Sequence, residues 1–174
     1  MVRSSETFLI DANALITPYR LYYAFDIVPS FWEKLASVFK NNRIVLLDKV
    51  KDELLKGEDD LTNWIKENEE IINVCNYKTE SVIANYQSVL QYIQTSGLYK
   101  ESALAAWVPA NIADPWLIAA AKANGYTVVT LEAPSGGLSP KAPNRIAKIP
   151  DVAKALGVKT SSLFEMMRTL GIVL

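Results

Sequence analysis

The sequence predicts an α/β fold with a parallel sheet, and two observations support this. Short apolar runs that suit buried strands alternate along the chain with longer segments whose apolar residues recur at helical spacing. Such alternation is typical of βαβ units, whose parallel strands are covered on both faces. The length of 174 residues allows one domain with a sizeable core, so we expect a single domain over residues 1–174.

Four apolar runs are predicted to be strands, because each is rich in branched or apolar residues and is bounded by polar or turn-forming residues. They cover residues 7–10, 43–47, 127–131 and 158–160.

Helices are predicted from apolar residues at helical spacing and from residues that start or stop helices. Val82, Tyr86, Val89 and Ile93, for example, form one apolar stripe. The predicted helices cover residues 31–39, 48–57, 80–94, 100–107, 114–124 and 151–157, with two more that begin at Asp59–Asp60 and at a capping box of Ser162 and Glu165. The predicted N-caps of three of them are Asp48, Asp114 and Asp151.

Two stretches are predicted to be loops. An apolar, helix-like run follows Asn13, but Pro18 and Pro29 frame a predicted loop before residue 31. The stretch that begins at Glu132 is punctuated by proline and glycine, and we expect it to be mobile.

The chain contains no histidine, which excludes several kinds of catalytic site. Ser-His-Asp and Cys-His constellations, HExxH zinc sites and histidine general bases cannot form. Hydrolytic chemistry would have to use carboxylates with oxygen-binding metals, lysine, or serine and threonine. A protein that is not an enzyme would also account for the absence.

The net charge and the cysteine content limit the expected binding partners and the expected location of the protein. The formal net charge is −1, so no global basic field exists to hold nucleic acid. This argues against a passive nucleic-acid-binding module, and less against an enzyme whose carboxylates bind cations. The single cysteine permits no intrachain disulfide, so we expect a cytoplasmic location. No apolar stretch approaches the roughly 18 residues of a membrane span, and the N-terminus lacks the pattern of a signal peptide.

Acidic residues follow the predicted strands, at the edge where parallel sheets bind ligands. Asp11 and Asn13 come directly after the first strand, and Thr130 and Glu132 come at the end of the third. Asp114 starts a helix with proline at the next position. Each of these acids fits the role of a turn or cap residue as well as that of a metal ligand, so the sequence leaves both interpretations open.

For two further acids, Glu53 and Asp151, the neighbouring sequence suggests different roles. Glu53 lies beside the helix face that Val50 and Leu54 define by their spacing, where a carboxylate is less often purely solvated. A surface position fits Glu53 about equally well. Asp151 has a structural explanation as a helix cap, which we favour.

Several carboxylates at one sheet edge would repel one another strongly in a partly desolvated site. A divalent cation removes this penalty, and Mg²⁺ prefers carboxylate and water oxygens that it shares with substrate phosphates. Two such ions about 4 Å apart can activate a water and stabilise the leaving oxygen of a phosphodiester. The pattern therefore predicts metal-assisted phosphoryl chemistry.

Four short motifs follow one another in order and are spread over most of the chain. They are Phe8-Leu9-Ile10-Asp11-Ala12-Asn13-Ala14-Leu15-Ile16, Val50-Lys51-Asp52-Glu53-Leu54, Asp114-Pro115-Trp116-Leu117-Ile118-Ala119 and Val128-Val129-Thr130-Leu131-Glu132. This order resembles the PIN domain, a nuclease fold found in VapC-type toxins of prokaryotic toxin–antitoxin systems. The long first loop, the Asp-Pro-Trp and the late Ile149-Pro150-Asp151-Val152 resemble an uncharacterised PIN-like family more than a standard VapC.

The resemblance implies a three-layer α/β/α domain with a mainly parallel central sheet and a Mg²⁺- or Mn²⁺-dependent endoribonuclease site. Carried over by position, it assigns the metal and the catalysis to Asp11, Glu53 and Asp114, with Asn13 and Thr130 in support. The family's usual Thr-x-Asp appears here as Thr-Leu-Glu, so the fourth acid is either Glu132 or Asp151. An RNA substrate, a cognate antitoxin and a homodimer are the implied partners.

Two other functions stay open. A haloacid-dehalogenase-like phosphatase also begins with a strand-borne aspartate, but it needs a second aspartate where this chain has Asn13. A non-catalytic PIN-like module that binds RNA or protein is favoured by the low net charge and opposed by the acids. Basic residues that could contact RNA, each of which also fits ordinary surface, are Arg20, Arg43, Lys141, Arg145 and Lys148.

Overall fold

The structure is a computed structural model that describes residues 6–174. Residues 1–5, on which the expectation about a signal peptide rests, lie outside the described residues. The elements run in the order β1 Phe8–Ile10, α1 Asn13–Leu21, α2 Pro29–Lys40, β2 Ile44–Leu47, α3 Asp48–Leu54, α4 Asp60–Glu67, β3 Asn73–Cys75, α5 Glu80–Thr95, α6 Glu101–Trp107, α7 Asp114–Asn124, β4 Thr127–Val129, α8 Ile149–Ala155, β5 Thr160–Ser161 and α9 Leu163–Leu170.

The five strands form one parallel sheet in the order β3-β2-β1-β4-β5. β1 is the central strand, and its Leu9 pairs with Val45 of β2 and with Val128 of β4. All three residues of β1 are buried, as expected for a strand covered on both faces. Because the strands run in one direction, their carboxyl ends meet along a single edge, which confirms the predicted parallel α/β sheet.

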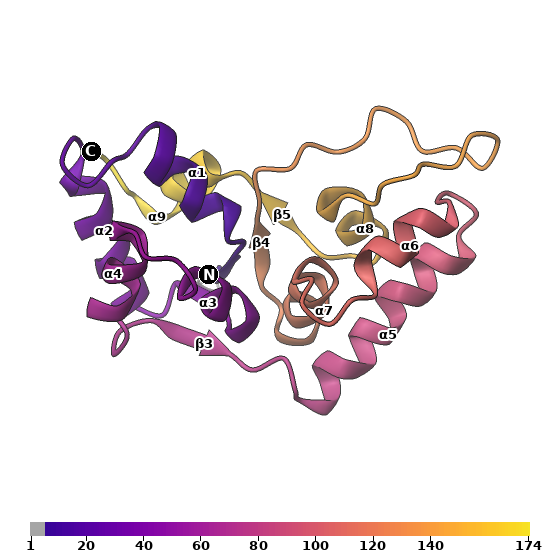
Figure 1. Cartoon of the computed structure of the whole chain (residues 1–174), viewed down its shortest axis with the longest axis horizontal. Helices are drawn as coiled ribbons and strands as arrows, with labels where there is room; N and C mark the ends of the chain where they lie inside the picture. The colour runs from indigo at the N-terminus through magenta and orange to yellow at the C-terminus, as the bar shows by residue number, and fades with distance from the viewer. Residues whose placement is uncertain (1–5) are drawn as a thin grey trace, which may run out of the picture.

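Two layers of helices cover the sheet (Figure 1). α1, α2, α4 and α9 lie on one side of it, and α5, α6, α7 and α8 lie on the other. α5 packs along α7 and buries Val82, Val89 and Ile93. The apolar stripe predicted for residues 80–94 therefore packs within the chain, and the three-layer α/β/α prediction is confirmed.

An aromatic cluster holds the layer of α1, α2 and α4 together. The Trp32 ring stacks on Phe25 with centroids 4.3 Å apart and meets Trp64 edge-on at 5.2 Å. Its indole N–H donates to the Tyr23 carbonyl at 2.7 Å, so the polar atom of this buried side chain has a partner.

Two elements differ from the prediction. β3 was not predicted, because it is a three-residue edge strand whose Asn73 and Val74 are exposed and give no apolar run. α1 continues past Pro18, where a loop was predicted. Proline removes only one backbone donor, and the Pro18 carbonyl still accepts the N–H groups of Tyr22 and Tyr23 and so closes the helix end.

The N-caps follow the prediction at two helices and depart from it at three. Asp59 caps α4, and Ser162 forms the predicted capping box of α9. The three predicted caps Asp48, Asp114 and Asp151 instead lie in the first turns of their helices, and the N-cap positions belong to Leu47, Ala113 and Lys148. The capping prediction for these three aspartates was therefore wrong.

Among the described residues, no helix combines the length and the apolar character that a membrane crossing requires.

Asp48 ties the start of α3 to the segment after β3. Its carboxylate accepts the Lys49 N–H at 2.9 Å and the Tyr77 N–H at 3.3 Å. We expect Asp48→Ala to lower the free energy of unfolding by about 1–2 kcal/mol, because both donors lose a charged acceptor. Urea denaturation measures this loss, with Glu33→Ala on the exposed face of α2 as the control. Equal stability of the two variants would contradict the prediction.

Candidate functional site

Three of the predicted acids line a pocket of about 480 Å³ at the carboxyl edge of the sheet. The end of β1, the helix α3 and the start of α7 form its walls. Its polar lining includes Asp11, Asn13, Asp52, Glu53 and Asp114. The structure thus brings together the three predicted core acids and Asn13.

Asp11 lies at the end of the central strand and is held there by the backbone. Its N–H donates to the Val129 carbonyl of β4 at 2.9 Å, and its carbonyl accepts the Ala14 N–H at 3.0 Å as α1 begins. Only 6% of the residue is exposed. The fold therefore fixes a carboxylate at a place where water reaches it poorly.

The electrostatics of the pocket are those of neighbouring carboxylates with little solvent. Burial raises the pKa of Asp11 to about 7, and the charges of Asp114, Glu53 and Glu132 add to the rise, against a hydrogen bond from the Ala12 N–H. Burial likewise raises the pKa of Asp114 to about 6, followed by the charges of Glu132 and Glu53. Four of the predicted acids thus lie close enough to act on one another.

Asp114 and Glu53 present their carboxylates to the pocket from two helices. Asp114 is not the N-cap of α7, and a hydrogen bond from its own N–H partly offsets the rise in its pKa. Glu53 is exposed and also lines the pocket, so its position is compatible with both sequence-based interpretations. Asp52 also lines the pocket.

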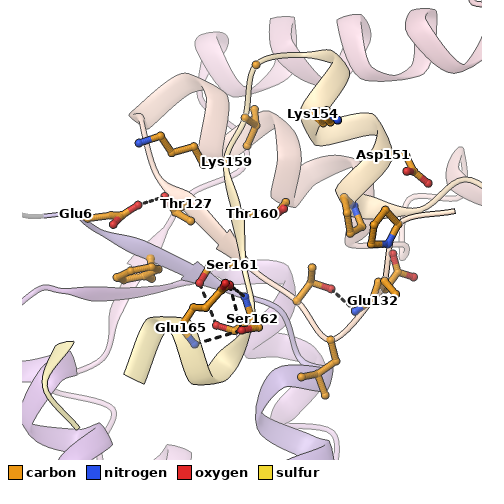
Figure 2. A pocket seen from close by; sticks show the side chains of 18 of the residues that line it. Glu6, Thr127, Glu132, Asp151, Lys154, Lys159, Thr160, Ser161, Ser162 and Glu165 are labelled. Atoms are coloured by element: carbon orange, nitrogen blue, oxygen red, sulfur yellow. Dashed lines mark hydrogen bonds between the residues drawn. The ribbon is translucent and has the colours of Figure 1, made fainter. Parts of the chain in front are cut away.

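Glu132 reaches the acidic cluster from the loop after β4. Its N–H donates to the Thr130 hydroxyl at 3.1 Å, and one of its carboxylate oxygens accepts the Ile149 N–H at the start of α8 at 2.7 Å. Thr130 therefore acts on the cluster through Glu132. Figure 2 shows Glu132 beside a larger hollow of about 1130 Å³ around β5, which contains none of the three core acids.

Asp151, the alternative fourth acid, is engaged elsewhere. Its carboxylate accepts the Ser135 N–H at 3.0 Å. Its charge adds to the burial that raises the pKa of Tyr92 and of Tyr99, and it is not among the charges that raise the pKa of Asp11. Of the two alternatives, Glu132 is the one whose charge raises the pKa of Asp11 and Asp114, and neither of the two lines the acidic pocket.

The basic residues proposed to contact RNA do not line the acidic pocket. They are Arg20, Arg43, Lys141, Arg145 and Lys148. Arg43 precedes β2 and donates to the Glu6 carbonyl at 3.0 Å, which places it at the opposite edge of the sheet. The basic residues that do line the pocket are Lys49 and Lys56, and no local sequence signal distinguishes either from an ordinary surface lysine.

Comparison with protein families gives a match to the family described as "Domain of unknown function (DUF4411)", over residues 8–174. The chain belongs to this family. A comparison with curated proteins finds no match.

Two solved structures are similar to this DUF4411 protein. FitAcB from Neisseria gonorrhoeae is 16% identical with a TM-score of 0.53, covering 91% of this chain and 99% of the other. VapBC2 from Rickettsia felis, solved bound to a DNA fragment from their promoter, is 13% identical with a TM-score of 0.54, covering 90% and 98%. At these identities the likeness shows the fold alone, and that fold is the predicted PIN-like one.

The acids of this DUF4411 protein suit a divalent cation in their chemistry. Within residues 6–174, no three His, Cys, Asp or Glu side chains are close enough together to enclose a metal ion as they stand. Mg²⁺ commonly keeps several waters and takes only one or two carboxylates from the protein. Asp11 and Asp114 would hold such an ion, with the exposed Glu53 side chain moving inward to join them.

The raised pKa of Asp11 makes the stability of the metal-free protein depend on pH. The unfolded chain loses this proton near pH 4, but the folded protein keeps it until about pH 7. Asp11 therefore favours folding at low pH, and this contribution falls as the pH rises from 4 through 7.

In EDTA, we expect the free energy of unfolding to fall from pH 5 to pH 8. Asp11→Asn should flatten this dependence and raise stability at pH 8 by a few kcal/mol, since one pKa unit corresponds to about 1.4 kcal/mol. Urea denaturation at both pH values measures the effect. A wild type whose stability increases between pH 5 and pH 8 in parallel with the variant would refute it.

Proposed function

We propose that this DUF4411 protein is a Mg²⁺- or Mn²⁺-dependent endoribonuclease that serves as the toxin of a toxin–antitoxin pair. The observation that carries the proposal is the burial of Asp11 beside Asp114 and Glu53, because burial and these two neighbouring charges raise the pKa of Asp11. Buried like charges persist in a fold when an opposite charge binds between them. The PIN-like fold supports the proposal, because it places these acids at the sheet edge where ligands bind.

The reaction adds one water across a phosphodiester. The water oxygen bonds to phosphorus, the bond to the departing ribose oxygen breaks, and the proton that the water loses is returned to that oxygen. A divalent cation, when bound, lowers the pKa of the attacking water and offsets the charge that develops on the phosphate. Asp11 and Asp114 would hold the cation, Glu53 would complete the protein ligands, and the charge of Glu132, in the loop after β4, acts on both aspartates.

The proposed setting follows from the same comparison. The similar structures are the complexes FitAcB and VapBC2, so we propose a cognate antitoxin as the partner of this chain. RNA is the proposed substrate, the cytoplasm is the proposed location, and a homodimer is the proposed assembly.

A second candidate function is a non-catalytic PIN-like module that binds RNA or protein. The observation that favours it is the absence, within residues 6–174, of three acids already spaced to enclose a metal ion. A metal-binding measurement separates the two functions, because the module has no need of the cation.

We expect Mn²⁺ to stabilise the protein at pH 7.5. At about ten times its dissociation constant, one bound ion adds about 1.4 kcal/mol, which should raise the melting midpoint by about 3–6 °C. Asp11→Asn should abolish the shift, and Asp151→Asn should retain it because that carboxylate is bound to Ser135. Equal shifts in all three proteins would indicate that Mn²⁺ binds elsewhere.

We expect the purified protein to cut single-stranded or structured RNA in Mn²⁺ and to stop in EDTA. Asp11→Asn should reduce the rate on the order of 100-fold or more, because the buried ligand is lost. Gel analysis of labelled RNA measures this. Equal cutting by both proteins would reveal a contaminating nuclease, and no cutting of any RNA by a protein that binds Mn²⁺ would favour the non-catalytic module.

A further inference from the structure

Lys49 carries a positive charge into the acidic pocket without pairing with a carboxylate. It lies on α3, one turn before Glu53, and lines the same pocket as Asp11 and Asp114. Yet the ion pair formed among residues 6–174 joins Lys51 to Glu69, on the same helix but outside the pocket. Lys49 therefore lines the same pocket as these acids and forms an ion pair with none of them.

Three contacts fix the position of this ammonium. Its Nζ donates to the Ala110 carbonyl, in the loop before α7, at 2.6 Å. The same atom lies 4.0 Å from the centroid of the Tyr77 ring and 5.4 Å from that of Trp116. Aromatic faces attract a cation but leave its charge intact. One of its three donors is used by Ala110, so the others are free for a ligand.

The two rings that contact the Lys49 ammonium, Tyr77 and Trp116, pack against each other and against Tyr86. Tyr86 of α5 stacks on Trp116 with centroids 3.7 Å apart and an interplanar angle of 14°. Tyr77 meets the same indole edge-on at 4.9 Å. Trp116 follows Asp114 by two residues in α7. The same helix therefore carries one of the rings under Lys49 and one of the acids of the cluster.

We propose that Lys49 is the phosphate-binding residue of this pocket and contacts a phosphate of the bound polynucleotide beside the acidic cluster. The inference rests on the proposed function, because it takes the polynucleotide to be the ligand. A polyanion approaching several carboxylates needs a fixed cation near them, and an unpaired ammonium binds phosphate as a point charge. Lys56 also lines the pocket, but the aromatic and carbonyl contacts that hold an ammonium in place belong to Lys49.

The main alternative is that Lys49 only positions the backbone. Its bond to Ala110 links α3 to the loop that leads into Asp114, so removing it could displace the metal-binding acids instead. The two roles predict different measurements. A positioning residue acts on stability and on Mn²⁺ binding, whereas a phosphate contact acts on the salt dependence of RNA binding.

The test compares wild type with Lys49→Met, Lys49→Arg and Lys78→Met. Lys49→Met keeps an apolar stem on the aromatic rings and removes the charge, and Lys49→Arg restores the charge. Lys78→Met is the matched control, because the Lys78 Nζ lies 5.6 Å from the centroid of the same Tyr77 ring but Lys78 does not line the pocket. Fluorescence anisotropy follows the binding of a short 2′-O-methyl RNA in Ca²⁺, between about 50 and 200 mM salt.

We expect Lys49→Met to weaken RNA binding several-fold and to make the slope of log Kd against log salt shallower by about 0.7, as for one lost phosphate contact with a single strand. Lys49→Arg should recover most of the slope, and Lys78→Met should match wild type. The melting midpoint of Lys49→Met and its shift in Mn²⁺ should stay those of wild type.

Three results would overturn the inference. They are an unchanged affinity and slope in Lys49→Met, a loss of the Mn²⁺ shift with an unchanged slope, and a wild type that binds no RNA but is stabilised by inorganic phosphate through Lys49. A different result would show that the proposed function has failed while this inference stands. RNA binding that depends on Lys49 without any cleavage in Mn²⁺ would remove the nuclease and leave the phosphate contact in place.

Discussion

The fold forces a carboxylate into a place where it is electrostatically unfavourable, and the rest of the site depends on this constraint. Asp11 cannot turn away from the pocket, because β1 is the central strand and the Asp11 N–H is bound to Val129 of the neighbouring strand. α3 and α7 then bring Glu53 and Asp114 to the same edge. A sheet that kept these acids only for solubility would place them where water could solvate them.

Much of this arrangement could be predicted from the sequence, because it follows from local patterns. Apolar strands that alternate with helices imply a parallel sheet, and a parallel sheet collects the residues after its strands at one edge. Asp11 and Asp114 are therefore placed correctly by strand and helix boundaries alone. Glu53 needed the additional argument of its angle on the helix, and its surface and pocket positions turn out to be compatible.

What could not be predicted depends on partners far away in the chain. The place of Lys49 is set by Ala110, Tyr77 and Trp116, which lie on a later loop, the segment before α5, and α7. The choice between Glu132 and Asp151 likewise depends on which backbone N–H each carboxylate meets. The capping error at Asp114 has a local cause: Ala113 has helical backbone angles and takes the cap position, so Asp114 falls one residue inside the helix.

The loop between β4 and α8 is fastened near both of its ends by carboxylates. Glu132 at its start holds Ile149, and Asp151 just past its end holds Ser135, so two bonds cross between the strand side and the helix side. These two bonds therefore separate residues 136–143 from the acidic pocket, and a change in this stretch should leave the pocket in place. A foreign peptide spliced in there, such as an epitope or a short fluorescent reporter, would extend the molecule at its periphery and leave the carboxyl edge of the sheet as it is.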